Sequence, residues 1–163
     1  MGVDPGLVAT GFAVLEAAPD AVTVLDVGVI TTGATQSLDA RLNAIHRAVL
    51  QIIEAHAPAF LVVEDLYAEY KFPRTAILMG HARGVIYLAA RQLGVAVTAL
   101  APSEVKRAVT GSGAAGKAQV QRSVQTLLGL ADLPRPSHVA DALGLAVTGL
   151  SRVTGVTPKR VAR

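Results

Sequence analysis

The chain has 163 residues, of which 52% are hydrophobic and 17% are charged. This composition excludes an intrinsically disordered chain, the length fits one ordinary domain, and no apolar run reaches the roughly 18 residues of a membrane-spanning helix. No cysteine occurs, which excludes disulfides, thiolate zinc sites and a cysteine nucleophile. No signal peptide opens the chain, so we expect a soluble, cytoplasmic globular protein without a membrane partner.

The charge is distributed unevenly along the chain. Residues 1–100 carry 6 Lys and Arg against 9 Asp and Glu, a net charge of −3, whereas residues 101–163 carry 9 against 3, a net charge of +6. A basic segment favours a polyanionic partner, because clustered cations release counterions from a phosphate backbone. Many basic proteins bind no nucleic acid, so charge alone leaves both interpretations open.

Three strands and a helix are predicted first. Apolar segments at residues 2–4, 11–15 and 22–30, separated by Gly, Pro and Asp turn residues, indicate an antiparallel meander. After Ser37, an N-cap candidate, apolar residues recur every three or four positions, which predicts an amphipathic helix that ends before Pro58.

The rest of the chain alternates strands and helices. The apolar run 60–63 predicts a buried strand that ends at Glu64, and a polar stretch to Arg74 follows it. We then expect a helix over about 75–92, a strand at 95–98, and helices from Pro102, over about 117–128 and over 137–151. The order βββαβαβααα predicts an α/β domain over residues 1–152, with a mixed five-stranded sheet covered by helices on both faces. Residues 153–163 are expected to be a basic tail.

Three acidic residues lie at the margins of these apolar segments. Asp4 precedes Pro5-Gly6 at the end of one strand and Glu64 ends another, so both carboxylates can emerge at one edge of the sheet. Asp141 and His138 are three residues apart and share a helical face. Taken singly, each acid has a simpler explanation: Asp4 as a turn residue, Glu64 as a paired acid at a strand end, and Asp141 as an exposed helix residue. Together with His138 they predict a catalytic Mg²⁺ or Mn²⁺ site, where two ions can clamp the oxygens of a phosphodiester.

A glycine-rich segment, Gly111–Lys117, has the glycine and lysine spacing of a phosphate-binding P-loop. The next residue is Ala118 rather than Ser or Thr, and the preceding segment is predicted to be helical rather than a strand. We therefore expect a loop that presents Lys117 at a helix N-terminus, where free N–H groups favour phosphate.

Five motifs in order resemble the RuvC family of Holliday-junction resolvases, over Asp4 to about Leu150. They are Asp4-Pro5-Gly6 with Thr10-Gly11, Val63-Glu64-Asp65-Leu66-Tyr67, Gly80-His81-Ala82-Arg83-Gly84-Val85, Glu104-Val105-Lys106 with Val109-Thr110-Gly111-Ser112-Gly113, and Ala140-Asp141-Ala142-Leu143. The resemblance implies a ribonuclease H-like fold. It also implies a homodimeric, metal-dependent endonuclease that resolves four-way DNA junctions in recombination and repair by paired nicks, leaving 5′-phosphate and 3′-hydroxyl ends.

The resemblance implies further roles for individual residues. Lys106 and Lys117 fall where such resolvases contact DNA near the scissile group, and Tyr67 falls where an aromatic ring stacks on an unpaired base. Arg74 could hold a backbone phosphate. Solvated lysines and arginines and a packed tyrosine are the simpler alternatives. Many family members carry Asp where this chain has His138, whose neutral imidazole can still ligate metal or take a proton from water.

Two other functions fit parts of the sequence. Asp4-Pro5-Gly6 with Gly11 also resembles the phosphate-binding hairpin of actin-like ATPases and sugar kinases, but those proteins need two such domains. A catalytically inactive nucleic-acid-binding module is the third possibility, and the presence of three acids argues against it. The helix stripe of Ala76, Gly80 and Gly84 fits a dimer interface or tight packing on the sheet. A branch-migration helicase is a further possible partner.

Overall fold

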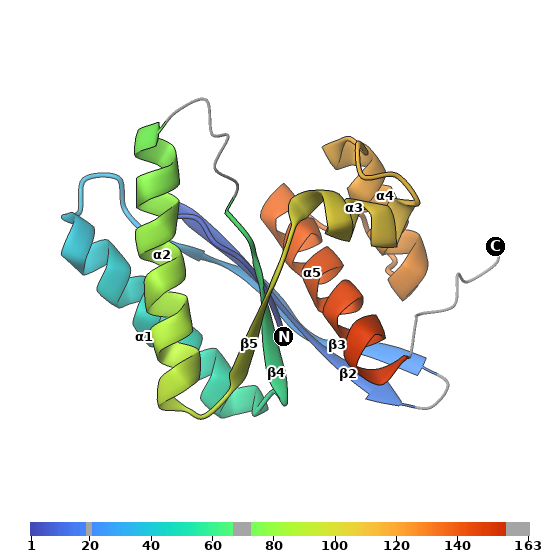
Figure 1. The fold of residues 1–163 in the computed structure, drawn as a ribbon, viewed down its shortest axis with the longest axis horizontal. Helices are drawn as coiled ribbons and strands as arrows, with labels where there is room; N and C mark the ends of the chain where they lie inside the picture. The colour runs from blue at the N-terminus through green and yellow to red at the C-terminus, as the bar shows by residue number, and fades with distance from the viewer. Residues whose placement is uncertain (19–20, 67–72, 156–163) are drawn as a thin grey trace.

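The computed structural model describes residues 1–18, 21–66 and 73–155 (Figure 1). Its order of strands and helices confirms the predicted one. The elements are β1 (Gly2–Asp4), β2 (Ala9–Ala18), β3 (Ala21–Thr31), α1 (Leu38–His56), β4 (Phe60–Glu64), α2 (Pro73–Gln92), β5 (Ala96–Leu100), α3 (Pro102–Thr110), α4 (Lys117–Leu128) and α5 (Ser137–Thr154).

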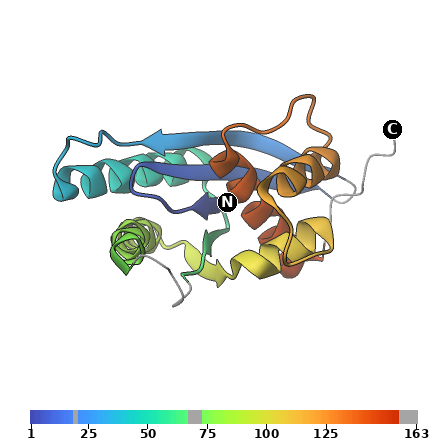
Figure 2. The same ribbon diagram turned by 90° about the horizontal axis from the view of Figure 1, so that it is seen from above.

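The five strands form one mixed sheet in the order β3-β2-β1-β4-β5. β1, β2 and β3 pair antiparallel, as the expected meander requires. β4 pairs with β1, and β5 with β4, in parallel. β2 and β3 are the longest strands and run across the molecule in Figure 2. The short β1 lies at the centre of the sheet, which is why all three of its residues are buried.

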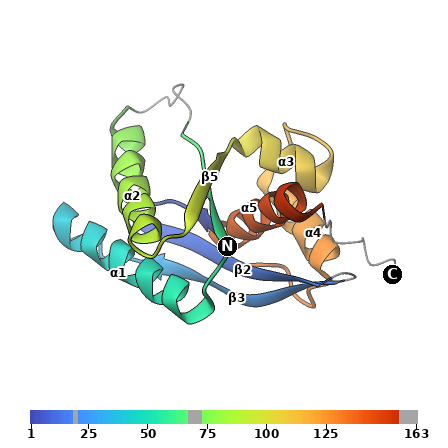
Figure 3. The ribbon, with the colours of Figure 1, turned by 60° about the horizontal axis from the view of Figure 1, so that its bottom comes forward.

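Helices cover both faces of the sheet, with α1 and α2 on one side and α3, α4 and α5 on the other (Figures 1 and 3). Successive residues of a strand point to opposite faces. Accordingly, Val63 of β4 packs with Ile45 and Ile86 in the core beneath α1 and α2. Its neighbour Val62 packs with Val105 and Leu145 beneath α3 and α5. The continuous apolar run of β4 therefore serves two cores.

Several boundaries differ from those expected. α2 begins at Pro73, so Arg74 lies in its first turn rather than in a loop. α5 continues to Thr154 and ends at Gly155, whose backbone is left-handed, so the residues after Arg152 begin as helix rather than as tail. Ser37 occupies the N-cap position of α1 but makes no side-chain capping bond. Within the described ranges, none of the helices is long and apolar enough to cross a membrane.

Candidate active site

The carboxyl ends of β1 and β4 bring Asp4 and Glu64 to one edge of the sheet. The two strands are parallel, with Val3 opposite Val63, so the acids that follow them end neighbouring strands. The turn after Asp4 is held by the buried Thr10, whose hydroxyl donates to the Gly6 carbonyl at 2.7 Å and accepts from the Gly6 N–H at 3.3 Å. This placement confirms the expectation of two strand-end carboxylates at the same edge.

Glycines allow α5 to lie directly on the sheet beside these acids. Gly11 of β2 is paired with Asp4, and a Cβ on Gly11 would lie 2.1 Å from the carbonyl oxygen of His138. A Cβ on Gly2 would lie 2.3 Å from the carbonyl oxygen of Ala142. Any side chain at these positions would push the start of α5 away. The close approach therefore delivers His138 and Asp141 to the same sheet edge as Asp4.

Asp4 and His138 are in direct contact, although they are 134 residues apart. The Nδ1 atom of His138 lies 2.7 Å from Oδ2 of Asp4, which is only 7% exposed. In the neutral tautomer that carries its proton on Nδ1, the imidazole donates this hydrogen bond and keeps Nε2 as a free acceptor. The pair thus fixes the orientation of the ring and leaves one ring nitrogen available for chemistry.

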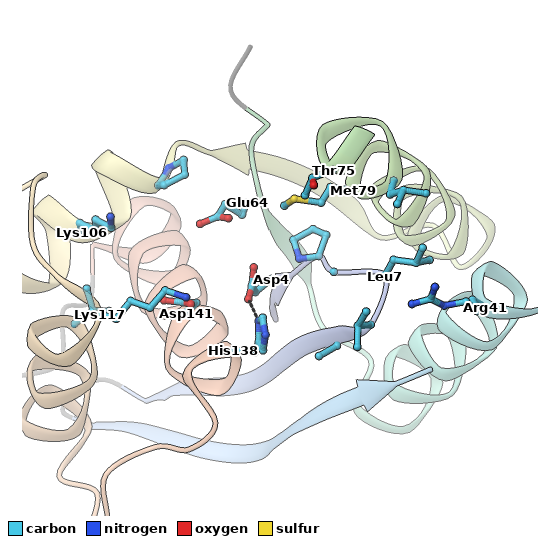
Figure 4. Close-up of a pocket in the computed structure, with 17 residues that line it drawn as sticks. Asp4, Leu7, Arg41, Glu64, Thr75, Met79, Lys106, Lys117, His138 and Asp141 are labelled. Carbon is cyan, nitrogen blue, oxygen red and sulfur yellow. Dashed lines mark hydrogen bonds and ion pairs between the residues drawn. The ribbon is translucent and has the colours of Figure 1, made fainter. Parts of the chain in front are cut away.

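A cavity of about 530 Å³ contains all four predicted catalytic side chains (Figure 4). Lys106 of α3 and Lys117, the first residue of α4, line the same end as the acids. Across the cavity lie Pro5, Gly6, Leu7, Val8, Ala9, Arg41, Thr75, Leu78 and Met79. One end of the cavity is thus rich in charge, and the walls toward the other end are mostly apolar.

Burial raises the pKa values of the three carboxyl groups, and repulsion between carboxylates adds to the shift for Asp4 and Glu64. The pKa of Asp4 is raised to about 6, mainly by burial and further by the charge of Asp141, against the opposing hydrogen bond from His138. The pKa of Glu64 is raised to about 7, by burial and by the charges of Asp4 and Asp141. Burial also raises the pKa of Asp141, while Lys117 opposes the shift. The site therefore disfavours three ionised carboxylates in the absence of a further cation.

The donor set fits a hard divalent cation. Carboxylate oxygens are the ligands that Mg²⁺ and Mn²⁺ prefer, and a cation would relieve the repulsion that raises these pKa values. Among the described residues, no three acidic or histidine side chains are already gathered tightly enough to form a metal cage. The carboxylates instead lie apart from one another at the charged end of the cavity (Figure 4). Side-chain rotation would be needed for them to bind one ion together.

The predicted DNA-binding residues are only partly brought to this cavity. Lys106 and Lys117 line it. Arg74 is exposed on α2 and is not among the lining residues, and Tyr67 lies outside the residues that the structure describes. The loop before Lys117 follows helix α3 rather than a strand, which confirms that the P-loop spacing is misleading.

Two residues of the site had no role assigned from sequence. Gly11 admits α5 to the sheet, and its place in the Thr10-Gly11 motif was the only signal. Arg41 lines the far end of the cavity, and in the sequence it is an ordinary polar position of an amphipathic helix. Both roles depend on contacts between distant segments.

Comparisons with known proteins agree with this geometry. The family model described as crossover junction endodeoxyribonuclease RuvC matches residues 1–149. The chain is 42% identical to RuvC of Rhodopirellula baltica over 91% of this chain and 84% of that protein. It is 44% identical to RuvC of Moorella thermoacetica over 90% and 87% of the two chains.

Solved structures lead to the same family. The structure of T. thermophilus RuvC in complex with Holliday junction substrate superposes with a TM-score of 0.84 at 35% identity, over 90% of this chain and 89% of that chain. The yeast mitochondrial Holliday junction resolvase Ydc2 has a TM-score of 0.61 at 13% identity, over 93% and 76% of the two chains, and shares the fold. With a ribonuclease H-like sheet whose strand-end acids meet α5, the chain belongs to the RuvC family of crossover junction endodeoxyribonucleases.

Proposed function

We propose that the cavity at the ends of β1 and β4 is where this chain hydrolyses phosphodiesters of four-way DNA junctions. The observation that carries the proposal is the convergence of Asp4, Glu64 and Asp141 from three separate elements on one cavity flanked by two lysines. A cluster of uncompensated carboxylates costs stability, which a purely structural role would not require.

Asp4, Glu64 and Asp141 are the residues that would hold the divalent ions, and His138 would be a fourth ligand if its free ring nitrogen binds metal rather than a proton. Mg²⁺ or Mn²⁺, with two ions in each site, would supply Lewis-acid stabilisation of the negative charge that develops on the phosphate oxygens. Lys106 and Lys117 lie at the same end of the cavity and would bind the phosphates on either side of the cut. Arg74 and Tyr67 would contact DNA outside the cavity.

His138 is assigned as the group that accepts a proton from the attacking water. Its Nδ1 faces Asp4, so the ring is oriented with Nε2 free to accept. Asp4 orients the imidazole through Oδ2 and, with its second oxygen outside this hydrogen bond, would still hold a metal ion. Direct ligation of metal by His138 is the other use of the same free nitrogen, and it also requires the neutral ring.

A stripe along the outer side of α2 supports a homodimer. Ile77, Gly84 and Leu88 share one helical face, because they are seven and four residues apart. Ile77 is 61% exposed and Leu88 is 51% exposed, and nothing lies within 4 Å of a Cβ built on Gly84. Packing on its own sheet therefore does not account for Gly84, whereas close approach of a second copy would. A twofold dimer would present two cavities to a nearly twofold substrate.

A cytoplasmic location and a branch-migration helicase partner remain predictions from composition and family resemblance. A phosphotransfer function gains no support from the structure. Actin-like ATPases and sugar kinases need two domains, each with a phosphate-binding hairpin, whereas the described residues form one five-stranded sheet with a single hairpin of β1 and β2 at the cavity.

The test uses the purified chain with a synthetic four-way junction and a linear duplex of matched sequence, with and without Mg²⁺ or Mn²⁺. We expect paired nicks in strands of like polarity on the junction only, and only with metal. Glu64→Gln should lose more than about 100-fold in rate, because it removes a metal ligand, while keeping junction affinity. Glu54→Gln, at an exposed position of α1, is the matched control. Equal nicking by Glu64→Gln and wild type would exclude Glu64 from the site.

A further inference from the structure

Arg41, near the start of α1, lies at the end of the cavity remote from the acids (Figure 4). The described residues that line this end with it are apolar, apart from Thr75 and the backbone of the turn after Asp4. Arg41 is therefore the charged side chain that this end of the cavity offers to a ligand.

The guanidinium of Arg41 lacks a counter-charge. Its Nη2 atom is buried without a hydrogen-bond partner, and no carboxylate of the described residues lies within ion-pair distance of it. Arg83, the other described arginine with a buried unbonded nitrogen, differs in that Asp65 neutralises it at 3.2 Å. A half-buried cation that lacks a counter-ion and has one N–H group without an acceptor is costly, and an anionic ligand would remove that cost.

The guanidinium is nevertheless held in place. Its Nε donates to the Thr32 hydroxyl at 2.9 Å, and that hydroxyl donates in turn to the Leu7 carbonyl. The N–H of Thr32 also donates to the Val8 carbonyl at 3.1 Å. Arg41 is thus fixed against the turn that follows Asp4, so that little side-chain entropy is lost when a ligand binds.

We propose that Arg41 binds a backbone phosphate of the same DNA strand whose scissile phosphodiester lies at the acids. This inference rests on the proposed function, because a strand cut at one end of the cavity carries further phosphates that must continue along or out of it. A guanidinium pairs with phosphate through parallel N–H donors, which suits an anchored arginine better than a mobile lysine. The subsite sets the register of the strand relative to Asp4, Glu64 and Asp141.

A purely positioning role is the alternative. Through Thr32 and Leu7, Arg41 could serve only to shape the turn after Asp4. The two roles differ in salt dependence. A lost phosphate contact flattens the slope of log affinity against log salt by about one unit, whereas a lost neutral bridge leaves that slope unchanged.

The experiment measures junction binding over a range of salt in EDTA, so that cleavage and metal play no part. Arg41→Gln is expected to bind about tenfold more weakly, as loss of a charged hydrogen bond predicts, and to have the flatter slope. Arg41→Lys should keep the slope. Thr32→Val tests the neutral bridge, and Arg47→Gln removes an equal charge from an exposed position of α1 outside the cavity. Both should keep the wild-type slope. A wild-type slope in a folded Arg41→Gln overturns the proposal.

Replacing single DNA phosphates near the cut by neutral methylphosphonates locates the phosphate that Arg41 binds. At one position the replacement should weaken junction binding by wild type but not by Arg41→Gln. Equal sensitivity of the two proteins at every position overturns the subsite. Should Arg41→Gln fail to fold, Arg41→Met, which also removes the charge and keeps a long side chain, takes its place in both measurements. A wild type that binds with this pattern but never nicks would refute the proposed function and leave the phosphate subsite standing.

Discussion

The helices over the two faces of the sheet differ in what they leave open: α5 is buried closely against one face, whereas α2, over the other face, has an open outward side. On one face, the backbone of α5 approaches the sheet so closely that Cβ atoms on Gly2, Gly11 and Gly149 would lie 2.1 to 2.3 Å from their neighbours. All residues from Ala142 to Leu150 of that helix are buried. On the other face, α2 keeps Ile77 and Leu88 exposed, and Gly84 meets nothing.

The difference matches what each face has to do. Ligands for a divalent ion must be placed to within a fraction of an ångström, and contact between backbones is the stiffest way to place a helix. A surface for a second copy needs exposed apolar side chains and room for approach. We therefore expect substitutions on the α5 face to reduce cleavage and substitutions on the α2 face to reduce association.

The largest effect is expected at His138 of α5. His138→Ala should slow cleavage by about 10²-fold or more, as loss of a general base does. Wild-type activity should fall at acid pH because Asp4 and Glu64, whose pKa values are raised to about 6 and about 7, lose the negative charge that would hold metal. His138→Asp should retain activity but need more metal, since it places a second carboxyl group beside Asp4. Cleavage rates from pH 5 to 9 at saturating Mg²⁺ or Mn²⁺ measure this. An Ala variant as fast as wild type would remove His138 from the mechanism.

A single methyl group compares the faces directly. Gly11→Ala forces the His138 carbonyl to move, and a displacement of about 1 Å can cost about 10²-fold in rate. Gly84→Ala meets open space within one copy, so it should leave the rate per site of the assembled dimer unchanged and stabilise α2 by roughly 0.5–1 kcal/mol, while weakening the association of two copies. Nicking rates and thermal unfolding of both variants test the contrast. Similar nicking rates in the two variants would show that α5 can shift on the sheet without loss of activity.

Polar substitutions on α2 test the other half of the comparison. Ile77→Ser together with Leu88→Ser should raise the dimer dissociation constant by at least about tenfold, because buried apolar anchors dominate interfaces. Each remaining monomer should still bind metal. Sedimentation analysis of wild type and variant, with Val153→Ser at the exposed end of α5 as control, gives the answer. A wild type that stays monomeric at all concentrations would contradict the assignment of this face.

A further prediction concerns stability and pH. Because burial and repulsion raise the pKa of Asp4 to about 6 and that of Glu64 to about 7, the folded chain holds protons that the unfolded chain releases. Their stabilisation is complete below about pH 4 and is lost as pH rises through 6 to 7, at about 1.4 kcal/mol per pKa unit. The metal-free unfolding temperature should therefore fall over this range, and Mg²⁺ or Mn²⁺ should restore it. Glu64→Gln should show a shallower fall, and an identical profile would refute the coupling.

The order of elements and the strand-end acids could be predicted because both depend on short stretches of neighbouring residues. Apolar runs such as 60–63 and the turn residues after Asp4 specify strand and turn within a few neighbouring positions. Parallel pairing of β1 with β4 then brings Asp4 and Glu64 together. The boundaries at Arg74 and beyond Arg152 differ from the apolar pattern because α2 begins at Pro73, a residue favoured at the first helical position, and α5 ends at Gly155, whose left-handed backbone terminates the helix.

Only the tertiary structure decided how the acids are supplied with partners. The contact between Asp4 and His138 spans 134 residues, and it exists because Gly11 leaves room for α5 on the sheet. The uncompensated Arg41 and the open face at Gly84 are likewise properties of what surrounds a residue rather than of the residue itself. Local sequence fixes backbone conformation through sterics and turn chemistry, whereas burial, counter-charges and close approach depend on which distant segments pack together.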